Sequence, residues 1–149
     1  MVTDGLDGET LLATISVRFS PGMPLDINAA ATHHTMYRPS VVQRHAFAQW
    51  SERSYAVGFP VAGPEMVLGV TAERLLVWRP TFLRTRAGRF AGAIPIERIH
   101  RAGMRRRILA SVLVLLFEDG AIIGVETLRT SKLREFARAI PTFTDDRAR

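Results

Sequence analysis

The chain has 149 residues, a formal net charge of +6, 47% hydrophobic residues and no cysteine. That length suits one domain with a single core, and the composition is globular, neither disordered nor membrane-spanning. The absence of cysteine excludes disulfides and thiolate metal ligands. Because the acidic start lacks the basic and apolar segments of a secretory signal, we expect a cytoplasmic protein, with the inner face of the membrane as an alternative surface for peripheral attachment.

The N-terminal third predicts one strand, a long loop and a helix. Leu11–Arg18 is apolar and β-branched, as a first strand requires. Phe19–Arg38 shows no sustained period, and Pro39 can begin a helix that runs to Tyr55. The helix would have an apolar stripe formed by Val42, Ala46, Phe47 and Trp50. We expect this stripe to be buried against the protein's own sheet, and burial against a second copy of the chain is the alternative. We therefore treat Phe19–Pro64 as an insertion between the first and second strands.

Short strands dominate the rest of the chain. Apolar alternation or continuous apolar character predicts four of them, and two more are weaker, since Pro95 interrupts one of the weak segments. The Asp119-Gly120 pair is a strong signal for a hairpin tip. The four clear strands are Met66–Thr71, Arg74–Arg79, Val112–Phe117 and Ala121–Glu126, and the weak ones are Ala91–Ile96 and Met104–Ile108.

An amphipathic helix is predicted at Ser131–Ile140, after the last strand. Thr130 or Ser131 can cap it, and Pro141 ends it. Its apolar residues recur at helical spacing: Leu133, Phe136, Ala137 and Ile140. The order of the elements indicates a single mainly β domain over residues 1–149, a small barrel or sandwich covered by a helix.

Four segments of the second half resemble bacterial pleckstrin-homology-like (PH-like) domains in their order and spacing. They are MVLGVTAERLLVWRP, IPIERI, VLVLLFEDGAIIGVE and TSKLREFARAI. The resemblance implies a partly open barrel of two crossed antiparallel sheets, about seven strands, with the C-terminal helix over one end. The insertion at Phe19–Pro64 is much longer than the usual connection, and it lacks the basic cluster of the phosphoinositide-binding members. Inositol-lipid binding is therefore not carried over.

A basic tract is the feature that most suggests function. Between Arg74 and Arg107 there are ten arginines and one acid, Glu97, whereas the whole chain has a net charge of +6. Arginine pairs with phosphate and carboxylate groups, so an anionic partner is one interpretation, and a solvated edge that discourages aggregation is the other. The candidate anion- or partner-binding site consists of six arginines of the tract and Phe82, which would be an exposed anchor. The residues are Phe82, Arg84, Arg86, Arg89, Arg101, Arg105 and Arg107.

Catalytic and metal signals are weak. The serines lack a nucleophile-elbow context, the acids are scattered, and His33-His34 has no accompanying ligand set. We therefore expect that the protein is not an enzyme and that it binds no cofactor, no metal and no small-molecule substrate. The expected function is a binding or scaffolding module for a protein partner or for self-association. Attachment to anionic membrane lipid through Phe82, Arg84, Arg86 and Arg89 is the alternative, and nonspecific nucleic-acid binding is the third.

Overall fold

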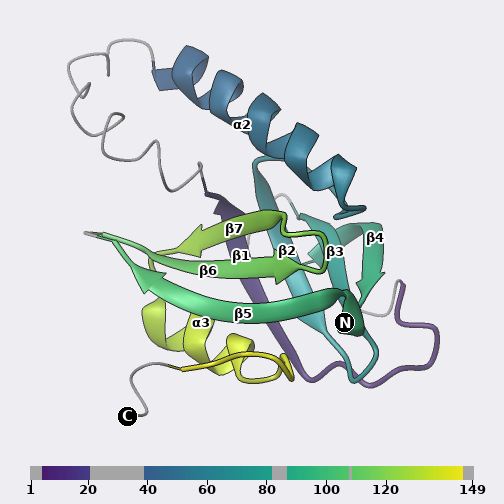
Figure 1. Ribbon diagram of the computed structural model, residues 1–149. Coiled ribbons are helices and arrows are strands. Elements are labelled where there is room, and N and C mark those ends of the chain that lie inside the picture. Colours follow the sequence, from purple (N-terminus) through teal and green to yellow (C-terminus); the bar gives the residue numbers. More distant parts are fainter. Residues whose placement is uncertain (1–4, 21–38, 82–86, 108, 146–149) are drawn as a thin grey trace.

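Seven antiparallel strands form one continuous sheet in the computed structural model, which describes residues 5–20, 39–81, 87–107 and 109–145 (Figure 1). The strand order is β4-β3-β2-β1-β7-β6-β5, so the first strand lies in the middle. The elements are β1 (Ala13–Phe19), α2 (Pro39–Ala56), β2 (Glu65–Val70), β3 (Arg74–Pro80), β4 (Ala87–Pro95), the 3-10 turn η3 (Ile96–Arg98), β5 (Ile99–Arg106), β6 (Ser111–Phe117), β7 (Ile122–Thr127) and α3 (Thr130–Ala137).

The mainly β class, the seven strands and the two predicted helices are confirmed, but the sheet is not closed into a barrel. In the part of the chain that the structure describes, β4 and β5 share no ladder, although they follow one another in sequence. The two halves of the sheet meet at β1, which pairs with β2 over six residues and with β7 over only two. They are therefore one hydrogen-bonded sheet rather than two.

Strand bounds differ from the predicted ones mainly where apolar alternation is weak. β1 begins two residues later than predicted and ends at Phe19. The weak segment Ala91–Ile96 overlaps the longer strand β4, which ends at Pro95, and Met104–Ile108 overlaps β5, which ends at Arg106; Ile108 lies outside the described residues. Pairing with β3 and β6 extends these strands through residues that carry no local strand signal.

Helix α2 packs on the protein's own sheet, as preferred for the insertion (Figure 1). The Trp50 side chain is fully buried, and its ring centroid lies 6.1 Å from that of Phe19 and 5.9 Å from that of Phe59. Its indole Nε1–H donates a hydrogen bond to the carbonyl oxygen of Gly124 in β7, at 2.9 Å. Phe47 joins this aromatic cluster, while the side chain of Val42 lies outside the described part of the structure.

The sheet also has a second, smaller core on its opposite face. Val67, Leu76 and Trp78 are buried there beneath Leu6 and Leu11 of the N-terminal segment. A side chain at Gly69 would place its Cβ 2.5 Å from the Trp78 ring, so a glycine lets the indole lie flat on β2. Trp78 is thus a core residue of this second core.

Helix α3 lies near β5 and β6 and also packs against β1 (Figure 1). It buries Leu133 and Phe136 as predicted, but it ends at Ala137, and Ile140 is buried in the turn that follows. The predicted cap is wrong. Arg129 occupies the capping position and forms no side-chain cap. The Thr130 hydroxyl, which was expected to cap the helix, instead lies 2.7 Å from that of Ser111 in β6. The start of α3 is therefore tied to the sheet by a side chain.

Replacing Trp50 with alanine should lower the free energy of unfolding by about 3–5 kcal/mol, the usual cost of a buried aromatic. The loss should not depend on protein concentration, because the helix packs on its own sheet. Urea unfolding at two protein concentrations measures both properties. Tyr55→Ala on the same helix, where the side chain is 68% exposed, is the control and should cost below about 0.5 kcal/mol. Melting of the wild-type protein that rises with concentration would contradict this packing.

Candidate functional site

The structure describes four of the seven residues of the predicted basic site, and these lie on β4, on β5 or directly after β5. Phe82, Arg84 and Arg86 lie outside the described residues. Arg89 is exposed on β4, whereas Arg101 and Arg105 are exposed on β5. Because β4 and β5 are the two ends of the strand order, the described arginines of the tract are distributed over both ends of the sheet.

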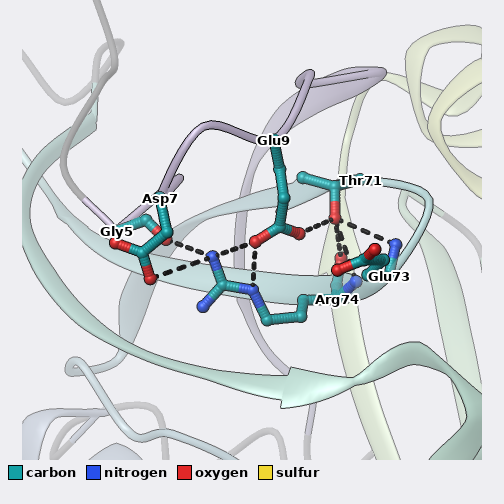
Figure 2. A network of polar contacts seen from close by, with 6 residues as sticks. All are labelled: Gly5, Asp7, Glu9, Thr71, Glu73 and Arg74. Carbon is teal, nitrogen blue, oxygen red and sulfur yellow. Dashed lines mark hydrogen bonds and ion pairs between the residues drawn. The ribbon is translucent and has the colours of Figure 1, made fainter.

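Two arginines of the tract have acidic partners. Arg107 is half-buried, and its Nη1 lies 3.5 Å from Oε1 of Glu126 in β7. Arg74 forms the network in Figure 2, in which its Nε donates to Oε2 of Glu9 at 2.7 Å and its Nη2 donates to the carbonyl oxygen of Gly5. The Arg74 side chain therefore connects β3 to the N-terminal segment, and the Arg107 side chain connects the end of β5 to β7.

The Arg74 network fastens the N-terminal segment over the second core. The Thr71 hydroxyl donates to Oε1 of Glu9 at 2.6 Å and accepts the backbone N–H of Arg74 at 2.9 Å (Figure 2). The hydrogen bond from Arg74, followed by that from Thr71, holds the pKa of Glu9 below its ordinary value of 4.5. The same bond to Glu9 raises the pKa of Arg74.

Because the pKa of Glu9 is lower in the folded protein, its ionised form contributes stability above pH 4.5, and that contribution is lost as the pH falls through the lowered folded value. Glu9→Gln should therefore be less stable than wild type at pH 7, and the difference should shrink on acidification below pH 4.5. Urea midpoints measured from pH 7 to pH 3 test this, with Glu118→Gln at the exposed hairpin tip as control. A difference that stays constant with pH would show that Glu9 is not held by this network.

A groove of about 710 Å³ opens on the sheet where β1 and β7 separate. The two strands pair only at Arg18↔Glu126 and Phe19↔Val125. Beyond Thr127 the chain leaves the sheet, passes through Leu128 and enters α3. The lining residues are Thr14, Ile15, Ser16, Val17, Arg18, Glu65, Met66, Val67, Pro80, Thr81, Ala87, Glu126, Thr127, Leu128, Arg129 and Lys132.

The separation leaves part of the β1 backbone open. Successive residues of a strand direct their N–H and C=O groups to opposite sides. Phe19 donates its N–H to Pro64 on the β2 side, and Ser20 donates its N–H to Gly124 on the β7 side. The N–H and C=O groups of Thr14 and Ser16 therefore point into the groove, and among the described residues they have no ladder partner there.

The groove has both apolar and cationic walls. Leu128 stands beside it with 76% of its surface exposed. Three cations line it, Arg18, Arg129 and Lys132, and none of these forms an ion pair with a described residue. Of the two lining acids, Glu126 is engaged by Arg107.

A second hollow of about 550 Å³ continues from the groove around the first turn of α3. It shares Leu128, Arg129 and Lys132 with the groove and adds the exposed Arg106 of β5. It also includes Arg134, whose Nε lies 3.2 Å from Oδ2 of Asp145. The cationic surface therefore extends from the outer face of β1 to the end of β5.

Most of these residues were not predicted. Of the predicted site residues that the structure describes, Arg107 contacts a residue of the groove, Glu126. Thr14, Ser16 and Arg18 alternate with apolar residues, which signals an exposed strand face, but no local pattern shows that their backbone edge is open. Leu128 is a lone apolar residue between polar ones, which is the one sequence signal that favours an exposed contact.

No protein-family model matches the chain, and a search of curated proteins finds no significant match. Across residues 5–20, 39–81, 87–107 and 109–145, no three acids or histidines lie together in a way that would hold a metal ion. His33 and His34 lie outside these ranges. No helix of the described part is both long and apolar enough to cross a membrane.

Proposed function

We propose that this protein is a non-enzymatic interaction module of PH-like architecture that binds an extended segment of a protein partner in the groove along β1. The open half-edge of β1 carries the proposal. Exposed N–H and C=O groups of a regular strand recognise the backbone of another strand, and a neighbouring pocket selects its side chains. The sheet of seven antiparallel strands and the helix packed at one end support the PH-like architecture.

The part of β1 that β7 leaves unpaired is more suitable for such pairing than either edge strand of the sheet. β4 is irregular, since its ladder with β3 shifts register twice and it ends at Pro95. The outer edge of β5 is partly occupied, because Ala102 exchanges backbone hydrogen bonds with Thr142 and Thr144 of the C-terminal tail. β1 is regular and is held in register by β2 over six residues.

The described aromatic residues favour a peptide over nucleic acid. Of the residues that suggested lipid attachment, Arg89 is exposed on β4 and does not line the groove, and Phe82, Arg84 and Arg86 lie outside the described residues. Single-stranded nucleic acid needs exposed aromatic faces on which bases stack. Trp78 is fully buried under the N-terminal segment, and Phe90 packs against the same core.

A selection from a displayed library of random peptides tests the proposal. Enriched peptides should bind the wild-type protein and Ser16→Ala but lose binding to Ser16→Pro. Proline removes only the N–H that points into the groove, not one that pairs with β2, so the strand should tolerate it. The matched alanine variant keeps the backbone donor.

Leu128→Gln is a second test that does not alter the strand, and it should weaken the same peptides. Thermal melting of each variant verifies that it folds. Failure to enrich any peptide would contradict the proposed function. Equal binding of the enriched peptides to all four proteins would place the interaction away from β1.

A further inference from the structure

We infer that the segment bound along β1 is acidic and occupies the positions that β7 leaves empty. This inference rests on the proposed function and adds the chemistry and position of the partner. Three observations carry it: the register of β1 with β7, the position of Leu128, and the groove cations that form no ion pair with a described residue.

The register fixes the position. Ser20 pairs with Gly124, and Arg18 pairs with Glu126, so a straight continuation of β7 would lie opposite Ser16 and then Thr14. The chain instead turns away after Thr127, where the Arg129 N–H donates to the Thr127 hydroxyl oxygen at 3.3 Å. A bound segment that takes the place of this continuation meets the N–H and C=O groups of both Ser16 and Thr14.

The side-chain preferences follow from the two walls. Alternate residues of a bound strand point to opposite faces. The outer face of β1 presents Arg18, and the far wall presents Arg129 and Lys132. These three side chains form no ion pair with a described residue, and carboxylates of a bound segment would pair with them. Leu128 offers an apolar contact to a residue in between.

The same charges disfavour a second copy of the chain bound through its own β1 edge. A second copy would bring its own groove cations, Arg18, Arg129 and Lys132, to an edge that already carries the same three. Like charges close together are unfavourable, most of all when they are partly desolvated. The alternative expected from sequence, self-association through strand edges, is therefore disfavoured at this edge, and an acidic partner is favoured.

The probe is a fluorescein-labelled, amide-capped peptide of alternating glutamate and valine, titrated with the full chain and followed by fluorescence anisotropy. Two matched peptides accompany it. One replaces glutamate with lysine, and the other keeps the glutamates but is N-methylated at alternate residues, which removes the backbone donors that face β1. Phosphatidylserine vesicles serve as an anionic surface without a peptide backbone.

The acidic peptide should bind at least about tenfold more tightly than the lysine peptide, and the N-methylated peptide should lose most of that affinity. The double variant Arg129→Gln/Lys132→Gln should weaken the acidic peptide by about tenfold, since each partly exposed ion pair contributes up to about 1 kcal/mol. The control Arg89→Gln/Arg101→Gln removes two exposed cations outside the groove and should leave the affinity unchanged.

Equal binding of the acidic and lysine peptides would overturn the inference, as would displayed peptides that are enriched on β1 but carry no acids; the proposed function would stand in both cases. Equal binding of the N-methylated peptide would show charge attraction without strand pairing and would also overturn it. Binding to vesicles together with no binding to any peptide would indicate a membrane surface and contradict both proposals.

Discussion

The pairing of β1 with β2 along its whole length, but with β7 only at its end, is the constraint on which the rest of the structure depends. A single strand of seven residues holds both halves of the sheet, with β2 on one side along its length and β7 on the other side at its end. Because the β7 ladder stops after two residues, the sheet opens there instead of continuing flat. This pairing of β1 with both neighbours produces one connected sheet, and the short β7 ladder leaves an unpaired stretch of β1 backbone with the groove beside it.

The two cores and the two helices keep this opening in place. α2 is fastened to β7 through Trp50 and Gly124, next to the last paired residues of β1. At the other end, the Ser111–Thr130 contact sets where α3 begins, and so where Arg129 and Lys132 stand. The N-terminal segment holds β2 and β3 from the opposite face through Arg74 and Glu9. The groove therefore lies beside elements that these contacts hold on the sheet, and a preformed site lowers the entropic cost of binding an extended segment.

Local patterns predicted the elements well and their assembly poorly. Alternating apolar residues marked β2 and β3, Asp119-Gly120 marked the hairpin between β6 and β7, and spacing marked α3, because these signals act over a few residues. The basic tract appeared as one site because its arginines are close in sequence. β4 and β5 lie at opposite ends of the strand order, and Arg74 and Arg107 pair with Glu9 and Glu126. The groove depends on where β1 and β7 part, a long-range pairing that no short segment encodes.

Amide hydrogen exchange of the free protein, followed residue by residue by NMR, measures the open edge directly. In the structure, Ile15 and Val17 direct their N–H groups towards β2, while Ser16 directs its N–H into the groove. Ser16 should therefore exchange far faster than Ile15 and Val17 on either side of it, because only amides bonded within the sheet require opening of the structure to exchange. Protection of Ser16 equal to that of Val17 would show that the edge is already paired and would contradict a binding groove along β1.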